Sequence, residues 1–314
     1  MDSEIISWLL GGDVSIQCQV HRDLLNTEKT SLRDRISQEG WGAAFLSQRK
    51  ANGHWGQAFY QPKWISTHYT LLYLLNLCIS PDTPAIQESL AIIFRDEKGP
   101  DGGIRPIGTV QKSDVCINGM LLNYASYFGV AESELESVVD FLLAQHMPDG
   151  GFNCMSNRKG AVHSSLHSTI SVAEGLQEYK KNGYRYRLAE CQKAEVGCRD
   201  FMLQHRLFKS DKTGEIINKK MLLLSYPSRW YYDILRALDY FQYADVPYEP
   251  RMDDALDVLL SKRRKDGTWP LQAKHSGRTH FDMEKGGCPS RWNTLRALRV
   301  LAHMKKIEAA GGIK

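Results

Sequence analysis

Three observations in the sequence predict an all-α protein, a closed α/α toroid in which two rings of helices are concentric. Turns centred on glycine recur about every 50 residues, and internal repeats of this length are typical of helical arrays. Helical patterns, with apolar residues three and four positions apart, flank each turn. One set of these helices is amphipathic and the other is apolar almost throughout, as expected for an outer and an inner ring.

The repeats define five clear helix pairs. Asp-Gly and Gly-Gly steps provide the turn chemistry that separates the two helices of a pair. The turns are centred on Gly53, Gly102, Gly150, Gly214 and Gly267. We expect the outer helices at residues 41–49, 85–95, 135–146, 189–205 and 251–264. We expect the inner helices at residues 66–78, 115–128, 163–179, 230–243 and 292–303.

The first residues precede the repeats. Residues 5–10 and 14–25 read as two short helices on either side of Gly11-Gly12. We interpret residues 1–35 as an N-terminal helical cap, a candidate for a sixth helix pair. Residues 36–314 form the toroid repeat domain, continuous in structure with that cap.

Composition excludes several classes of protein. The net charge is only +4 and the sign of the charges alternates along the 314 residues, so the sequence shows no basic cluster typical of nucleic-acid binding. No apolar stretch of about 18 residues is present, so we expect no membrane span, and no signal peptide is visible. Seven cysteines, an odd number, indicate a reducing cytosol and a cytoplasmic protein. No nucleotide cofactor is expected.

Polar and aromatic residues gather where the inner helices begin. Proline, a basic residue and tryptophan recur there, ending at Trp64, Trp230 and Trp292. In a ring these N-termini lie at one end, where their dipoles favour anions. We therefore expect a mouth at that end. The basic candidates for an anionic group are Lys63, Arg105, Arg229 and Arg291, unless each pairs with a carboxylate of a neighbouring repeat. The remaining substrate-binding candidate is His68.

The turns carry a further marker, a Gln-rich segment that ends in glycine and an aromatic residue. With this marker the sequence resembles the squalene-cyclase and protein-prenyltransferase β-subunit group, over roughly residues 36 to 305. The resemblance implies an α/α toroid. The Asp-x-Asp-Asp motif of the family's cyclases is absent, which argues against a cationic cyclase. The matching segments run from Gln48 to Trp55, from Gln145 to Phe152 and, loosely, from Lys262 to Trp269.

The protein prenyltransferases of this group hold zinc with an Asp-x-Cys at the start of one inner helix and a histidine at the start of the next. Asp114 and Cys116 open one inner helix here, and His163 and His167 open the following one. On a helix, residues four apart share a face, and thiolate and imidazole suit tetrahedral zinc. His167 matches the family's histidine best by its position in the helix, so the resemblance implies a zinc site at Cys116 and His167, with His163 or Asp114 as a further ligand.

Other roles for these residues stay open at this point. Cys116 with either histidine could form a nucleophile and its base, or Cys116 could be a buried apolar residue. Asp233 could be a general base, a further zinc ligand or the counter-ion of Arg229. The candidate catalytic residues are thus Cys116, Asp233 and His163.

Three functions follow as hypotheses. The first is a zinc-dependent, transferase-type enzyme acting on a small molecule with an apolar body and an anionic or polar head, such as an isoprenoid. The second is a carbohydrate-active toroid that uses Asp114 and Asp233 as its carboxylate pair. The third is a non-catalytic toroid that binds a ligand or a protein. The oligomeric state stays open, as does the need for a partner subunit.

Overall fold

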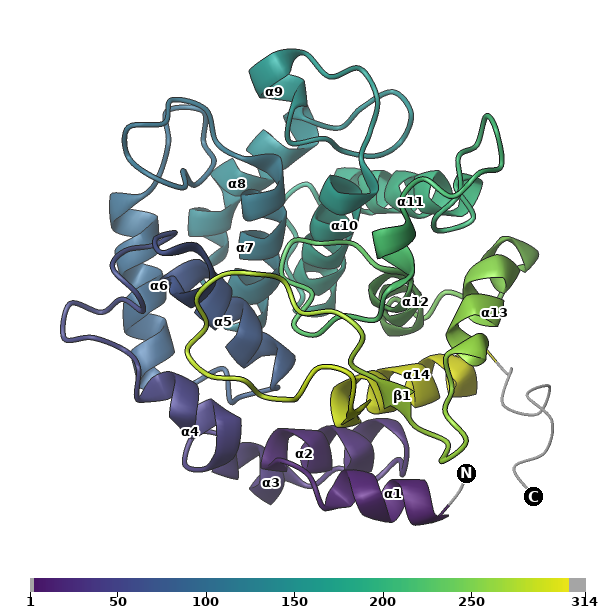
Figure 1. Ribbon diagram of the computed structural model, residues 1–314. Helices are drawn as coiled ribbons and strands as arrows, with labels where there is room; N and C mark the ends of the chain where they lie inside the picture. Colours follow the sequence, from purple (N-terminus) through teal and green to yellow (C-terminus); the bar gives the residue numbers. More distant parts are fainter. Residues whose placement is uncertain (1–2, 305–314) are drawn as a thin grey trace.

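The computed structural model describes residues 3–304 and confirms the all-α fold, with a single two-stranded ribbon among the described residues. Figure 1 shows two concentric rings of helices. The inner ring consists of α2 (Val14–Asp23), α5 (Thr67–Asn76), α7 (Val115–Tyr127), α10 (Leu166–Lys181), α12 (Ile234–Tyr243) and α14 (Arg291–His303). The outer ring consists of α1 (Ser3–Leu10), α4 (Gly40–Leu46), α6 (Pro84–Asp96), α8 (Glu132–Ala144), α11 (Leu188–Gln204) and α13 (Asp253–Ser261).

Short elements connect the two rings. They are α3 (Thr30–Arg35), α9 (Ser156–Lys159), η1 (Lys63–Ile65), η2 (Lys219–Leu222), η3 (Pro250–Met252), β1 (Trp269–Pro270) and β2 (Pro289–Ser290). The strands β1 and β2 pair antiparallel and enclose the long connection between α13 and α14. Among the described residues no helix combines the length and apolar character that a membrane crossing requires.

Burial separates the two rings as the sequence predicts. Every residue of α7 except Tyr127 is buried, because this helix is covered on both sides. In the outer helix α8 only one face is buried, from Leu135 to Leu142. The charged residues of α8 lie outside this buried face.

The N-terminal helices α1 and α2 complete a sixth helix pair, and this pair closes the ring. Helix α2 contacts both α14 and α4, so the last inner helix meets the first. The turn at Gly53 packs on the next outer helix, where an added Cβ would lie 2.3 Å from Ile92 Cδ1. The turn at Gly267 packs in the same way on α1, with 2.4 Å to Ile5 Cδ1. A boundary at residue 35 stays a prediction.

Aromatic residues after the glycine turns bind each turn to its own outer helix. The indole N–H of Trp55 donates to the carbonyl of Phe45 at 2.6 Å, and that of Trp269 donates to Leu259 at 2.7 Å. Both tryptophans are fully buried. They hold the repeats together and do not line a cavity.

Two inner helices begin later than the sequence predicts. Helix α10 begins at Leu166, and α12 begins at Ile234, where Asp233 accepts a hydrogen bond from the backbone N–H of Arg236 at 2.8 Å. An acidic N-cap of this kind satisfies a free N–H of the first turn. The prediction that His163 and His167 share a helical face is wrong, since His163 lies in the loop before α10.

Candidate functional site

A cavity of about 670 Å³ occupies the centre of the ring and is lined by all six inner helices. Its exposed lining residues lie where the inner helices end, for example Arg22, Asn76 and Lys181. Its lining residues at the opposite end are buried, among them Arg229 and Trp292. The cavity therefore opens at the C-terminal ends of the inner helices and has its floor near their N-termini.

The N-terminal end of the ring is covered by residues 271–288, here called the closing loop, which cross the face of the ring between β1 and β2 (Figure 1). The indole N–H of Trp64 donates to the carbonyl of Ser276 at 2.5 Å. The ring of Phe281 packs against Phe45 with centroids 4.5 Å apart. A second hollow of about 340 Å³ lies beneath the loop. The expected mouth at this end is thus closed, because the long connection to α14 folds back over it.

Charged side chains line the central cavity to an unusual degree for a buried space. Eight are basic and five are acidic, so the lining carries a surplus of positive charge. The basic residues are Arg22, Lys29, Arg33, Lys181, Arg229, Arg236, Arg296 and Arg299, and the acidic residues are Asp23, Glu28, Glu174, Glu178 and Asp239.

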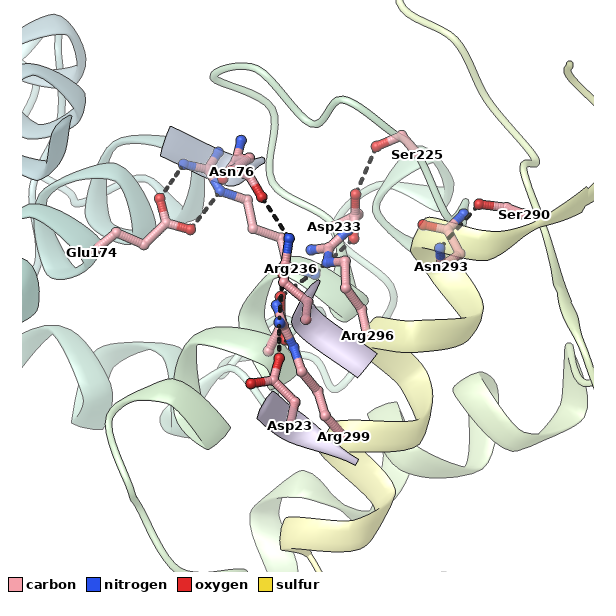
Figure 2. A network of polar contacts seen from close by, with 12 residues as sticks. Asp23, Asn76, Glu174, Ser225, Asp233, Arg236, Ser290, Asn293, Arg296 and Arg299 are labelled. Atoms are coloured by element: carbon pink, nitrogen blue, oxygen red, sulfur yellow. Dashed lines mark hydrogen bonds and ion pairs between the residues drawn. The ribbon is translucent and has the colours of Figure 1, made fainter. Parts of the chain in front are cut away.

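Some of this charge is paired between neighbouring inner helices. Arg236 on α12 forms a bidentate ion pair with Glu174 on α10, in which Nε and Nη2 donate to the two carboxylate oxygens at 2.9 and 2.6 Å (Figure 2). The same guanidinium donates to the carbonyls of Arg229 and Tyr231. Arg236 therefore fixes the segment that precedes α12 as well as the junction of α10 and α12.

A second network joins α2, α12 and α14, with more guanidinium groups than carboxylates. Arg299 contacts Asp23 at 2.9 Å and Asp239 at 2.6 Å, and Arg296 shares Asp239 at 2.9 Å. Arg22 also uses Asp23. Burial alone would raise the pKa of Asp239, but the charges of Arg299 and Arg296 outweigh it and hold the pKa below its ordinary value. Three arginines thus share two carboxylates.

The floor of the cavity holds hydrogen-bond donors without acceptors. Arg229 and Arg296 are 5% and 6% exposed, and Trp292 is 2% exposed. Within residues 3–304 no acceptor bonds to Arg229 Nε, Arg296 Nη1 or Trp292 Nε1. A buried donor without a partner costs about 1–3 kcal/mol, so the floor favours an acceptor-rich group.

The structure divides the predicted substrate-binding residues between several places. Arg229 and Trp292 line the central cavity, and Trp64 lies under the guanidinium of Arg229 at 4.2 Å. Arg291 lies outside the cavity, since its guanidinium covers Trp8 and donates to the Trp8 carbonyl. Three further candidates lie outside the cavity lining. Lys63 lies over the rings of Trp64 and Trp230, and Trp230 stacks on Tyr231. Arg105 donates to the carbonyl of Gly108.

The predicted histidines lie apart from each other. His68 is fully buried and contacts the hydroxyl of Tyr124 at 3.2 Å, and burial lowers its pKa to about 3. His167 Nδ1 accepts a hydrogen bond from the backbone N–H of Tyr232 at 2.8 Å, and burial lowers its pKa to about 4. His163 is exposed. Neither His163 nor His167 belongs to the donor cluster around Cys116.

That donor cluster consists of Asp114, Cys116 and Cys154, whose ligand atoms lie within 4.8 Å of one another. The two sulfur atoms are 2.22 Å apart, at disulfide distance. The hydroxyl of Ser168 contacts both sulfurs, at 3.2 and 3.1 Å. Arg158 pairs with Asp114 at 3.0 Å. Cys154 takes the place that the sequence analysis assigned to a histidine, and it lies in the loop after the turn at Gly150.

Asp233 is held by hydrogen bonds within the fold. It is 1% exposed, and its carboxylate accepts hydrogen bonds from the Ser225 hydroxyl at 2.6 Å and from the Arg236 backbone. Burial raises its pKa. No ion pair joins it to Arg229 among the described residues, because that guanidinium donates to the carbonyl of His275. Asp233 and Asp114 do not line the central cavity.

The sequence analysis did not identify Arg236, Arg296 and Arg299, which line the central cavity. A signal for them exists in the sequence. The segment Leu-Arg-Ala-Leu occurs twice, at residues 235–238 and 295–298, inside two otherwise apolar inner helices. A charge within a helix that is covered on both sides must face a polar interior or a partner charge.

Comparisons with known proteins give structural likeness only. No family model and no curated protein matches the chain. Among solved structures, the chain is similar to the type II terpene cyclase MstE from Scytonema without ligand, at 13% identity and a TM-score of 0.46, covering 95% of this chain and 89% of that chain. A variant of that cyclase bound to geranylgeranyl dihydroxybenzoate gives 13% identity, a TM-score of 0.47 and coverage of 95% and 88%. An identity this low carries neither a substrate nor a reaction from one protein to the other.

Proposed function

We propose that the protein is an enzyme that encloses a small phosphate ester in the central cavity, with the anionic head at the floor and the body toward the opening. The observation that carries the proposal is the surplus of guanidinium charge around the cavity, above all at Arg229 and Arg296. Arginine is suited to phosphate, because its planar fork donates two parallel hydrogen bonds.

The electrostatic argument rests on the cost of buried charge. Removing a cation from water without a partner is expensive. Arg229 is 5% exposed and has no carboxylate partner among the described residues, since its guanidinium contacts the carbonyl of His275, the hydroxyl of Tyr73 and the face of the Trp64 ring. An anion bound beside Arg229 and Arg296 would offset this cost. It would also accept from N–H groups that have no acceptor within residues 3–304.

The body of the ligand has two candidate classes. Leu72 and Leu75 on α5 offer an apolar surface, which suits an isoprenoid diphosphate, the class that the sequence resemblance implies. Asn123 and Gln242 in the same lining suit a sugar phosphate. The shared chemistry is the phosphate group. A volume of about 670 Å³ lies within the usual range for small-molecule sites, about 300–1,000 Å³.

Asp114, Cys116 and Cys154 would hold a zinc-class ion when both cysteines are reduced. Zinc accepts both thiolate and carboxylate donors, and the two thiolates favour it over magnesium and calcium, which prefer oxygen ligands. These residues do not line the central cavity. Zinc there would supply a Lewis acid at the N-terminus of α7, and it would also tie the loop at Cys154 to that helix.

Thermal-shift measurements test the proposal and separate the two ligand classes. The panel contains inorganic diphosphate, farnesyl diphosphate, farnesol, a hexose phosphate and the free hexose. A ligand that binds only the native state raises the melting temperature by mass action. We expect stabilisation by the phosphorylated members, with farnesyl diphosphate more effective than inorganic diphosphate.

The matched variants are Arg229→Met and Arg291→Met, since both remove a guanidinium near the N-terminus of an inner helix but only Arg229 lines the cavity. The shift should be lost in the first and kept in the second. A larger effect of the hexose phosphate would identify the sugar class. No shift with any phosphorylated compound would contradict the proposal.

A further inference from the structure

Aromatic rings form much of the wall of the second hollow, the space of about 340 Å³ beneath the closing loop. The ring of Phe45 packs against those of Tyr73 and Phe281, with centroids 5.5 and 4.5 Å apart, and His280 meets it edge-on at 5.8 Å. All four side chains line the hollow. An apolar cavity of about 150 Å³ is already large enough for benzene, so the hollow has room for a single-ring aromatic molecule.

Two lining residues of the hollow carry a buried nitrogen atom that has no hydrogen-bond partner within residues 3–304. These atoms are Nε2 of His275 and Nε of Arg229. The His275 ring is held in place, since it stacks on Tyr231 with centroids 3.8 Å apart and the His275 carbonyl accepts from Arg229 Nη1 at 3.0 Å. Burial lowers the pKa of His275 to about 4, so the ring is neutral near pH 7. A ligand hydroxyl group, which both donates and accepts, would satisfy Nε2 in either tautomer.

The charges around the hollow are balanced, unlike those of the central cavity. Lys274 pairs with Asp282 at 3.0 Å. The carboxylate of Glu284 accepts from the hydroxyl of Ser290 and from the backbone N–H of Arg291, and the guanidinium of Arg229 is the matching cation in the lining. Without a surplus of either sign, the hollow favours an uncharged ligand.

We propose that the hollow beneath the closing loop is a second ligand site, which binds a small uncharged aromatic molecule with one hydroxyl group, a phenol. The ring of the phenol packs against Phe45, Tyr73 and Phe281, because aromatic pairs gain energy beyond the area that they bury. Its hydroxyl group bonds to Nε2 of His275 and supplies the partner that this atom lacks.

The second hollow and the central cavity adjoin but open at opposite ends of the ring. Tyr226 and Arg229 line both spaces, and a guanidinium has five N–H donors, enough to contact a ligand in each. Ser276 and Thr279, which line the hollow, are exposed on the closing loop. A phenol therefore enters from the N-terminal end and does not displace a ligand of the central cavity.

The test titrates three matched compounds into the full-length protein and follows them by saturation-transfer NMR. They are p-cresol, toluene, which lacks the hydroxyl group, and 4-methylcyclohexanol, which lacks the aromatic ring. We expect p-cresol to bind saturably and about fivefold more tightly than either of the others, and saturating inorganic diphosphate should not displace it. Equal affinities of the three compounds, no saturable binding, or displacement by diphosphate would overturn the proposal. This comparison needs no variant, so it stands even where a substitution disturbs folding.

Variants locate the bound phenol. His275→Phe keeps a ring beside Tyr231 and removes the nitrogen, so p-cresol should bind about fivefold more weakly while toluene is unaffected. Met283→Trp fills the hollow and should abolish binding of both. His205→Phe is the matched control, because that ring packs on Phe201 at the end of α11, outside the hollow, and it should change nothing.

Binding of p-cresol that is unchanged in both His275→Phe and Met283→Trp would place the ligand elsewhere and contradict the proposal. Neither residue lines the central cavity, and none of the three compounds carries a phosphate group. Failure of the phenol site would therefore not bear on the proposed phosphate site, and failure of the phosphate site would not remove the phenol site.

Discussion

The two ends of the ring are built from the same six inner helices but differ in what covers them. At the N-terminal end the closing loop is fixed by the indole of Trp64 and by Thr70, whose hydroxyl contacts His280 at 3.0 Å. At the C-terminal end the cavity opens between charged side chains such as Arg22 and Lys181. The helix N-termini, which attract anions in principle, are therefore covered, and arginines inside the ring provide the positive charge.

This difference between the two ends of the ring distinguishes residues that stabilise the fold from residues that line the cavity. Asp233 caps α12, and Arg291 covers Trp8. Both lie at the closed end and outside the cavity lining. Arg229 and Arg296 are buried and line the central cavity. Substitutions at the two ends should therefore affect different properties of the protein.

The largest effect is expected for Arg236→Met. It leaves the carboxylate of Glu174 without its partner and removes donors from the carbonyls of Arg229 and Tyr231. Breaking a buried pair from one side costs about 3–5 kcal/mol, and we expect roughly 3 kcal/mol in the free energy of unfolding, measured with denaturant. Arg95→Met, which breaks an exposed pair, should leave the free energy of unfolding nearly unchanged. Equal losses would mean that Arg236 does not join the inner helices.

Substitutions that disturb the closure of the ring should have the next largest effect on stability. Gly267→Ala places a Cβ 2.4 Å from Ile5 at a φ of +79°, so both the backbone and the contact with α1 are strained. Gly214→Ala has a φ of +70° with nothing within 4 Å and carries the backbone cost alone, about 1 kcal/mol. We expect Gly267→Ala to lose more stability than Gly214→Ala in denaturant unfolding. A loss that is no larger would contradict the packing of α1 against the last turn.

These features show how far the sequence predicts the fold. The repeats and the two helix classes predicted ten of the ring helices, because apolar periodicity and glycine turns are local signals. The closing loop could not be predicted, since its position depends on contacts with Trp64 and Phe45, more than 200 positions away along the chain. The cluster of possible metal donors matches the sequence prediction only in part. Asp114 and Cys116 lie together, but Cys154 joins them from a loop whose path the sequence does not reveal.

Metal content should depend on the three clustered donors. After purification under reducing conditions with zinc added, we expect about one zinc per chain by elemental analysis, lost in Cys116→Ser and in Cys154→Ser. Cys18→Ser and His163→Ala should retain it, because neither residue lies in the cluster. Zinc that persists in Cys154→Ser and disappears in His167→Ala would favour the ligand set inferred from the sequence alone.

Acidification should destabilise the closed, N-terminal end of the ring, with a smaller effect than the substitutions above. Burial lowers the pKa of His167, His275 and His280 to about 4 each, from an ordinary 6.5. The unfolded chain therefore binds more protons between these values, and stability present above pH 6.5 is lost as the pH falls toward 4. Hydrogen exchange should accelerate in the closing loop before it does so in α7. Uniform acceleration across both segments would argue against a local effect of these histidines.

Calorimetric titration with inorganic diphosphate tests the central claim most directly. The wild-type protein, Arg229→Met and Arg291→Met are compared at low salt, after circular dichroism has shown that each is folded. The account predicts saturable binding at one site per chain, weakened by about tenfold or more in Arg229→Met and unchanged in Arg291→Met. Absence of saturable binding, or equal weakening in both variants, would contradict an anion site in the central cavity.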